Sequence, residues 1–339
     1  MSGPPCPETI PTYYPITLHV IAGVSVPINL VGFYLVWFQS PKMQGYKYCL
    51  CYLQFVSFLT EMHMSWICPG YYFFPIIAGY NTGWEIITPH MSMTLYVLIL
   101  AFELPSMLLC FVFRNMAARQ INQSGSRKMY MEKLWIFFAH VVPFALAYGM
   151  WRSNLTYDQK YNFVKENWPQ CLPWMSHSAF EVYDYKLNPW LTVTGLGAGV
   201  VIFLIFSYTS FLGIQTLTIL QKYRRTMSRQ TYQMHRTALI SLVLQLLMPG
   251  IVLVVPFSIC LTVVVTEAIG LQELATDTMF LVGSHSMCSC TVMIFSNPRY
   301  RKFLKEKLVK SFGLMKLTNP ATTVEPSRVA NSLAAVMKN

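Results

Sequence analysis

Among the ionisable side chains inside long apolar stretches of the sequence, where a charged group is costly, four are of most interest. They are two glutamates, Glu61 and Glu103, and two histidines, His63 and His285. A carboxylate or imidazole in such surroundings either pairs with a polar group on a neighbouring helix or lines a site for a ligand. These four residues are therefore the first candidates for function.

No arrangement typical of catalysis accompanies them. The sequence holds no HExxH pair, no Ser-His-Asp order and no glycine-rich phosphate loop. Its nine cysteines form neither CxxC pairs nor His–Cys clusters at zinc spacing. We therefore expect no enzyme, no catalytic residue, no metal site and no cofactor.

The composition indicates that the elements holding these residues span a membrane. Of the 339 residues, 54% are hydrophobic and only 12% are charged, whereas soluble domains have about 25% charged residues. A run of about 20 apolar residues crosses the hydrocarbon core of a bilayer. Seven such runs occur, at residues 16–38, 48–68, 88–113, 134–151, 190–220, 237–265 and 276–296. We predict an all-α membrane protein, a seven-transmembrane helix bundle at residues 16–296.

The basic residues give this bundle an orientation. Of the 25 Lys and Arg residues, 21 lie in alternate loops and the C-terminal tail, and only four lie in the other set of loops. Lys and Arg concentrate on the cytoplasmic side of membrane proteins. Residues 1–15 are therefore expected to form an extracellular N-terminal segment, and the C terminus to be cytoplasmic. The same distribution explains the net charge of +11 without any nucleic-acid partner.

The segment after the last apolar run has a different pattern. Asn297 and Pro298 end the run, and apolar residues then recur at positions 300, 303, 304, 308 and 312 with lysines between them. This helical spacing predicts an amphipathic helix at residues 297–313 that lies on membrane lipids of the inner leaflet. A disordered cytoplasmic tail is expected at residues 314–339.

Depth in the bundle separates the ligand-binding candidates. Glu61 lies 13 residues into the second run, which places it roughly 20 Å from the cytoplasmic side. His63 is about 200° further around the helix and cannot share the face of Glu61. We expect one of the two to line an outward-facing cavity, and the alternative is a hydrogen bond to a neighbouring helix. His285, in the seventh run, is a further ligand-binding candidate for which an interhelical hydrogen bond is the favoured interpretation.

Other residues are candidates for a conformational switch. Glu103 lies roughly 22 Å from the outer end of the third run, too deep for a ligand contact. It is a candidate for a latch with Arg114 or with a polar group of a neighbouring helix. Pro249 and Pro256 each remove an intrahelical hydrogen bond from the sixth run. They are either static bends or parts of a hinge.

The outer segments contain two candidate modifications. Three cysteines, Cys6, Cys68 and Cys171, lie on the oxidising side, so at least one of them stays unpaired. Pairing cannot be deduced from sequence alone; we favour a Cys6–Cys171 disulfide, which would tie the N-terminal segment to the long outer loop. Asn154 begins an N-glycosylation sequon with Thr156, within about three residues of the fourth run.

Three segments of the chain resemble one receptor family. They are Pro11–Tyr48, with its Tyr13-Tyr14 and Ser40-Pro41-Lys42-Met43 motifs, the stretch FFPIIAGYNTG at Phe73–Gly83, and SNPRYR at Ser296–Arg301. In this combination they resemble the nematode serpentine receptor class I chemoreceptors, and class H is similar. The resemblance implies a chemosensory seven-transmembrane receptor that binds an odorant-like small molecule and signals through heterotrimeric G proteins. It also implies the plasma membrane of sensory-neuron cilia as the location.

The sequence departs from the broader rhodopsin-like pattern. No acid precedes Arg114, no cysteine lies at the outer end of the third run, and Asn297-Pro298-Arg299-Tyr300 is one residue short of Asn-Pro-x-x-Tyr. The activation switches of that class therefore do not carry over.

Two alternative functions were considered. A ligand-gated channel of the insect olfactory type would have its N terminus inside, opposite to the charge distribution. A transporter would be favoured by inverted repeats or by acids clustered at the midplane, and neither is present.

Overall fold

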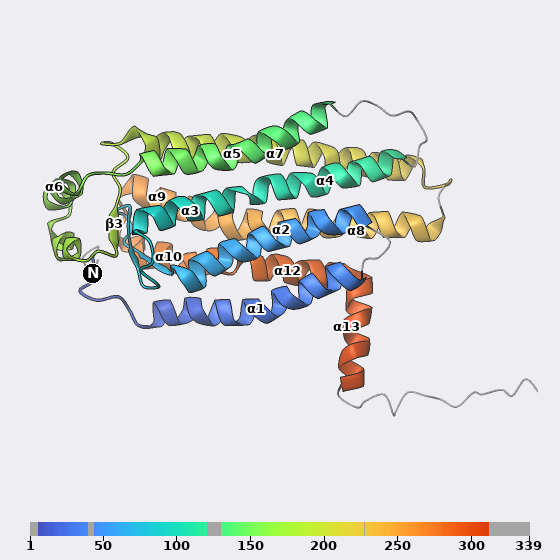
Figure 1. The fold of residues 1–339 in the computed structure, drawn as a ribbon, viewed down its shortest axis with the longest axis horizontal. Coiled ribbons are helices and arrows are strands. Elements are labelled where there is room, and N and C mark those ends of the chain that lie inside the picture. Colours follow the sequence, from blue (N-terminus) through green and yellow to red (C-terminus); the bar gives the residue numbers. More distant parts are fainter. Residues whose placement is uncertain (1–5, 40–43, 121–129, 227, 312–339) are drawn as a thin grey trace, which may run out of the picture. The chain divides into compact units, whose positions relative to one another are not determined.

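The computed structural model describes residues 6–39, 44–120, 130–226 and 228–311. The chain divides at Asn297 into two compact units, which are described separately. The first is a bundle of long helices with an outer assembly at one end (Figure 1). The second contains one described helix, α13 (Pro298–Ser311).

We number the spans of the bundle in chain order. Spans 1, 4 and 5 are single helices: α1 (Tyr13–Gln39), α5 (Tyr130–Arg152) and α7 (Pro189–Lys222). Spans 2 and 3 have two parts each: α2 (Gln44–Met62) with a π-helix (His63–Ile67), and α3 (Pro89–Ala101) with α4 (Glu103–Gln120). Span 6 consists of α8 (Arg229–Pro249), a π-helix (Gly250–Val254) and α9 (Val255–Thr266). Span 7 follows a 3₁₀ turn (Ile269–Leu271) and contains α10 (Gln272–Asp277), α11 (Met279–Gly283) and α12 (His285–Ser296).

Not all of these helices are equally apolar. Among the described residues, five spans are long and apolar enough to cross a membrane, and a sixth is the bent pair Ile269–Gly283 and His285–Ser296. The remaining span, α2, is the polar one, with Gln54, Ser57, Thr60 and Glu61 all buried. It packs against α1, α3, α4 and α12. Because helices surround it, these polar groups face protein instead of lipid.

Spans 3 and 6 are irregular where proline interrupts the backbone. The break between α3 and α4 falls at Phe102, next to Ala101, whose carbonyl would accept from residue 105 in a continuous helix. Residue 105 is a proline and has no N–H to donate. In span 6, Pro249 ends α8 and Pro256 lies in the first turn of α9, so the π-helix lies between the two prolines. Span 7 bends by 46° between Gly283 and His285, and there no proline is involved.

The two outer loops fold into a small assembly that the sequence analysis did not predict. β1 (Gly70–Tyr72), β2 (Ala78–Asn81) and β3 (Phe180–Val182) form an antiparallel sheet in the order β1-β2-β3. Tyr71 lies opposite Tyr80, and Tyr80 lies opposite Phe180. Helix α6 (Tyr157–Asn167) and a 3₁₀ helix (Pro169–Ser176) complete it. We call the assembly of residues 6–12, 69–87 and 153–188 the outer cap.

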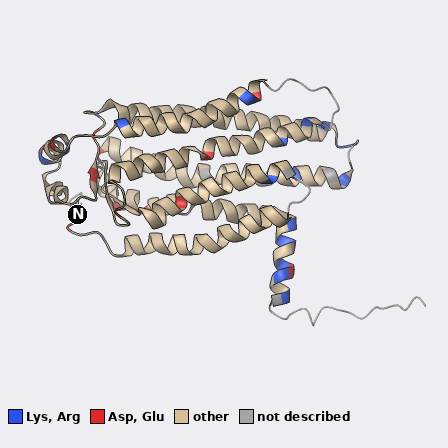
Figure 2. Cartoon of the chain, viewed as in Figure 1, with Lys and Arg blue, Asp and Glu red and all other residues tan. Residues whose placement is uncertain are grey.

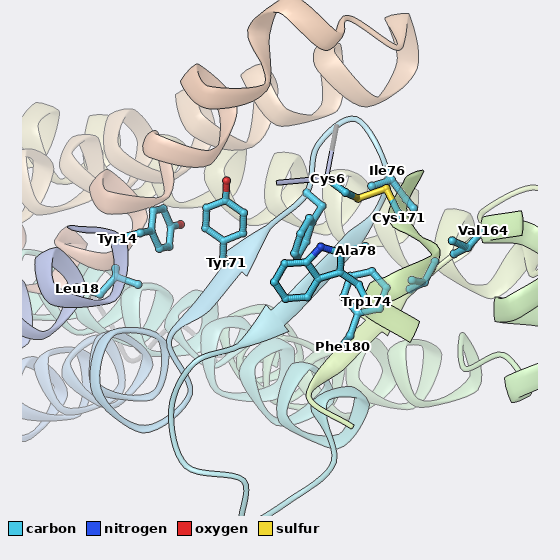
Figure 3. Packing of buried hydrophobic residues seen from close by; sticks show 12 residues of the cluster. Cys6, Tyr14, Leu18, Tyr71, Ile76, Ala78, Val164, Cys171, Trp174 and Phe180 are labelled. Atoms are coloured by element: carbon cyan, nitrogen blue, oxygen red, sulfur yellow. A yellow bond between two sulfur atoms is a disulfide. The ribbon is translucent and has the colours of Figure 1, made fainter. Parts of the chain in front are cut away.

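An aromatic cluster and a disulfide hold the outer cap together. The rings of Phe73, Trp174 and Phe180 pack edge to face, with centroids 5.0 and 5.3 Å from Phe73. Figure 3 shows the disulfide Cys6–Cys171 beside this cluster, with Tyr71 and Tyr14 leading from it toward span 1. Trp174 Nε1 donates to the carbonyl of Pro7 at 2.9 Å. The N-terminal segment is thus fixed to the loop between spans 4 and 5.

The charges of the first unit agree with the predicted orientation. Figure 2 shows most of the Lys and Arg residues of the bundle at the end away from the outer cap. The cap contains the disulfide, and disulfides form in oxidising compartments. We therefore take the cap as the extracellular side.

The second unit contains the amphipathic helix that the sequence predicts at residues 297–313. Helix α13 has exposed lysines, one of which, Lys302, lies 3.9 Å from Glu306 one turn later. The predicted disordered tail, residues 314–339, lies outside the described residues.

Removing the disulfide should destabilise the cap. The bond joins residues 165 positions apart, and such a cross-link contributes roughly 2–4 kcal/mol. We expect Cys6→Ala to lower the melting temperature of the purified protein, and Cys6→Ala/Cys171→Ala to lower it no further. The free Cys68 provides the control, because Cys68→Ala breaks no cross-link. Equal melting temperatures for wild type and Cys6→Ala, both kept free of reductant, would contradict the prediction.

Glycosylation of Asn154 should report the orientation. Asn154 is exposed, two residues beyond the end of α5, and Thr156 of the sequon caps α6. We expect peptide N-glycosidase to reduce the mass of the receptor made in eukaryotic cells, and Asn154→Gln to abolish that shift. A wild-type receptor whose mass the enzyme leaves unchanged would show that Asn154 carries no glycan.

Candidate functional site

A cavity lies under the outer cap. It has a volume of about 120 Å³ and is lined mainly by apolar and aromatic groups from span 2, span 3 and all three strands. We call it the outer cavity. A second, of about 10 Å³, lies deeper between spans 2, 6 and 7, and a space of that size holds no more than a water molecule. Of these two, only the outer cavity is large enough for an organic ligand.

His63 is the polar residue of the outer cavity with unused hydrogen-bonding capacity. It begins the π-helix of span 2 and is 5% exposed. Its Nε2 lies 3.5 Å from Ser92 Oγ on α3, whereas Nδ1 is buried with no hydrogen-bond partner among the described residues. The ring lies beside that of Tyr96, with centroids 5.9 Å apart. A π-turn often marks a functional site, and here it places the imidazole at the cavity.

Several other polar groups of the cavity wall already have partners. The hydroxyl of Tyr96 contacts Met64 Sδ at 3.6 Å, and that of Tyr183 lies 3.0 Å from His90 Nδ1. Glu181 forms an ion pair with Lys160 of α6. Burial raises the pKa of Tyr72 to about 12 and the pKa of Tyr183 well above its usual range. Both phenols therefore keep their protons at neutral pH.

A second group of polar residues lies deeper, where spans 1, 2, 3 and 7 meet. We call it the polar network; it contains Ser25, Asn29, Gln54, Glu61, Ser65, Glu103, His285 and Ser286. Its strongest contact joins the breaks of two spans, since His285 Nε2 lies 2.8 Å from Glu103 Oε1. His285 is 1% exposed and Glu103 8%. His285 Nδ1 lies 2.8 Å from the carbonyl of Val282.

Two side chains of span 2 occupy backbone groups at the break of span 7. Glu61 Oε2 accepts from the backbone N–H of Met287 at 2.9 Å, and Ser65 Oγ donates to the carbonyl of Gly283 at 3.2 Å. In a continuous helix the N–H of residue 287 would donate to the carbonyl of residue 283. The two side chains thus satisfy both halves of one of the backbone hydrogen bonds that the bend opens. The other carboxylate oxygen, Glu61 Oε1, is buried without a hydrogen bond to any residue that the structure describes.

Asn29 extends the network to span 1. Ser286 Oγ donates to Asn29 Oδ1 at 3.1 Å, and Gln54 Nε2 donates to the Asn29 carbonyl at 3.0 Å. Asn29 Nδ2 in turn donates to the carbonyl and the hydroxyl of Ser25. We did not identify Asn29, Gln54 or Ser65 as site residues from sequence. The only signal was a single polar residue in an apolar run, which is too common to choose among.

The structure separates the predicted ligand-binding residues. His63 lines the outer cavity, whereas Glu61 and His285 belong to the polar network and do not line it. Glu61 and His63 thus face different neighbours, as their angular separation on one helix requires.

The structure also shows the contacts of Glu103 and Arg114, two of the candidates for a conformational switch. Glu103 pairs with His285 of span 7, and the guanidinium of Arg114 lies over the ring of Tyr46, 3.6 Å from its centroid. Of the two latch partners considered for Glu103, the structure therefore shows the polar group of a neighbouring helix. No group of three or more potential metal ligands occurs in the described part of the chain.

Comparison with known proteins gave one result. The model of a family described as serpentine type 7TM GPCR chemoreceptor Sri matches residues 4–304. These residues include every span, the outer cap and both groups of polar residues. A search among curated proteins found no match for this chain.

The Glu103–His285 pair should behave as one energetic unit. Removing one partner of a buried ion pair costs about 3–5 kcal/mol, because the other charge stays buried. We expect Glu103→Gln and His285→Asn each to lower the melting temperature strongly, and the double variant to lower it by much less than the sum. His140→Asn is the control, since His140 contacts only the carbonyl of its own helix, at Ile136, and the ring of Tyr52. Additive effects of Glu103→Gln and His285→Asn would show that the two residues are not coupled.

Proposed function

The chain belongs to the serpentine Sri family of seven-transmembrane chemoreceptors, and we propose that it binds a small-molecule ligand in the outer cavity and signals through heterotrimeric G proteins. The observation that carries the proposal is the outer cavity itself. It lies on the extracellular side, has a largely apolar wall and contains a polar group with unused capacity. Such a combination is typical of small-molecule sites.

Span 2 connects the cavity to the interior of the bundle. His63 faces the cavity, while Glu61 and Ser65, two residues before and after it, hold the bend of span 7. A ligand that moves the π-turn of span 2 therefore changes the contacts of span 7 as well. We propose that ligands shift the populations of two arrangements of these spans.

The cytoplasmic ends of the spans offer a surface for a G protein. The loops at residues 114–133 and 221–236 together hold ten Lys and Arg residues and one acid. On span 3, Asn115 Nδ2 donates to Gln215 Oε1 and Thr216 Oγ1 of α7, and Arg119 pairs with Glu132 of α5. Spans 3, 4 and 5 are thus tied together at this end. We propose that span 6 moves against them, with the π-helix between Pro249 and Pro256 as its hinge.

The family also suggests where the receptor works. The chain is a multi-pass membrane protein, and we propose the plasma membrane of sensory-neuron cilia as its location and olfaction as its role. Glycosylation at Asn154 is part of the same proposal, because that residue lies on the extracellular side.

Filling the outer cavity should abolish the response to ligand. Ser92 is buried in the cavity wall, and Ser92→Leu would place a larger apolar side chain there. We expect the potency of an activating compound, found by screening odorant pools with a G-protein reporter, to fall at least tenfold in Ser92→Leu. Surface expression is measured in parallel with an extracellular epitope tag.

A matched variant provides the control. Ser207→Leu makes the same change on an exposed position of α7, which does not line the outer cavity. It should respond as wild type does. Equal potency in Ser92→Leu and wild type would show that the ligand binds elsewhere.

A further inference from the structure

The first inference rests on the proposed function and narrows it to a class of ligand. We propose that the outer cavity takes an uncharged, largely apolar molecule whose single polar group hydrogen-bonds to His63 Nδ1. His63 is then the residue that determines specificity. The volume of the cavity, the chemistry of its wall and the charges around it each support one part of this proposal.

The cavity volume limits the size of the ligand. The outer cavity has about 120 Å³, and an apolar protein cavity of about 150 Å³ binds benzene. A ligand of about six to eight non-hydrogen atoms therefore fits without rearrangement of the wall.

The wall favours an apolar body. Tyr72, Phe74, Tyr96 and Tyr183 supply aromatic surface, and the hydroxyls of Tyr96 and Tyr183 are engaged by Met64 and His90. A ligand with several polar groups would lose the water that hydrates these groups, and the wall would offer few hydrogen bonds in its place. His63 Nδ1 is a buried wall atom with no hydrogen-bond partner among the described residues, and one polar group on the ligand would match it.

The charges around the cavity disfavour an ion. Glu181 is the one carboxylate in the described wall, and Lys160 neutralises it. The described wall contains no Lys or Arg. A cation therefore meets no uncompensated carboxylate, and an anion meets no cationic side chain.

Ser92, which contacts His63 Nε2, determines which polar group of the ligand suits His63 Nδ1 best. Ser92 Oγ lies at Nε2 and can either donate to it or accept from it, depending on the tautomer. Nδ1 then takes the opposite role. A ligand hydroxyl, which both donates and accepts, suits either tautomer.

Three molecules of the same shape test the proposal: benzyl alcohol, ethylbenzene and benzylamine. Binding is measured on the purified full-length receptor by the shift in melting temperature over a concentration series. One hydrogen bond raises affinity roughly tenfold, so benzyl alcohol should stabilise the receptor at about one tenth of the ethylbenzene concentration. Benzylamine, which is an ammonium ion at neutral pH, should bind more weakly than either.

Variants of His63 test whether this residue causes the preference for benzyl alcohol over ethylbenzene. His63→Leu should remove the preference for benzyl alcohol and keep the binding of ethylbenzene, and His63→Asn should retain part of the preference. His140→Leu, a histidine outside the cavity, should keep the full preference. Ser92→Leu should abolish the binding of all three compounds.

The outcomes separate this inference from the proposed function. Stronger binding of benzylamine, an unchanged preference in His63→Leu, or no binding of any compound would overturn the inference. A receptor that shows the expected preference and yet activates no G protein would leave the inference standing and contradict the signalling part of the proposed function.

A second inference comes from the bend of span 7; it does not depend on the class of ligand, and its test rests on the proposed signalling function. We propose that Glu61 and Ser65 form a clip that stabilises the bent form of span 7 against a straight form. In the straight form the N–H of Met287 bonds to the carbonyl of Gly283, and both side chains are released. The bent and straight forms thus compete for the same two backbone groups.

Gly283 allows the clip to close. A Cβ atom at this position would lie 2.9 Å from Ser65 Oγ and 3.2 Å from a methyl group of Leu18. Gly283→Ala should therefore displace the Ser65 hydroxyl and act as Ser65→Ala does. Glu61, Ser65 and Gly283 therefore act on the same equilibrium, between the bent and the straight form of span 7.

A functional cycle tests the clip. Glu61→Leu, Ser65→Ala and their combination are compared for ligand-free signalling and for ligand potency at equal surface expression. Because one two-state equilibrium controls both quantities, each variant should shift them together and in the same direction. The double variant should shift them no further than the larger single variant.

Ser106→Ala is the matched control, since that buried hydroxyl bonds within its own span, to the carbonyl of Glu103. It should leave both quantities unchanged. Additive effects of Glu61→Leu and Ser65→Ala, a change in one quantity without the other, or no change in either would overturn the clip.

Discussion

A polar group in the interior of a membrane protein must have a partner inside the protein, and this constraint organises the whole bundle. Glu103 and His285 satisfy each other across the breaks of spans 3 and 7. Glu61 is satisfied on one oxygen by a backbone amide that is available only because span 7 is bent there. The central position of α2 and the contact of Asn29 with span 7 agree with this constraint, and the breaks of spans 3 and 7 lie beside the paired groups.

The outer cap is stabilised in a different way from the helix bundle. Its strands are only three or four residues long, too short to be stable alone, and they gain stability from aromatic packing and from the disulfide. The same strands form part of the outer cavity wall. Because the cap fixes the N-terminal segment to the loop between spans 4 and 5, the cavity has a wall made of parts that are distant in sequence.

Length and hydropathy were sufficient to indicate six of the seven spans, because an apolar run of the length of the bilayer has few other interpretations, whereas the more polar α2 does not pass that criterion. The sequence also identified Glu61, Glu103 and His285, since ionisable residues are conspicuous in such runs. It did not predict that Glu103 pairs with His285. Rise per residue gives the depth of a side chain, whereas pairing also depends on which helices are neighbours and how each is rotated. The sheet was missed because strands as short as Phe180–Val182 leave no alternating pattern, and Ser92 was missed because a serine in a helix is usually unremarkable.

The polarity of α2 has a consequence for how the receptor is made. Among the described helices of the bundle, α2 is the span that length and hydropathy alone do not identify as membrane-spanning. A helix of this kind gains little from lipid, so it remains in the bilayer only when its neighbours cover Gln54 and Glu61. The partners of these residues, Asn29 and Met287, lie near opposite ends of the chain. The polar groups of span 2 can therefore all find their partners only after span 7 has been synthesised.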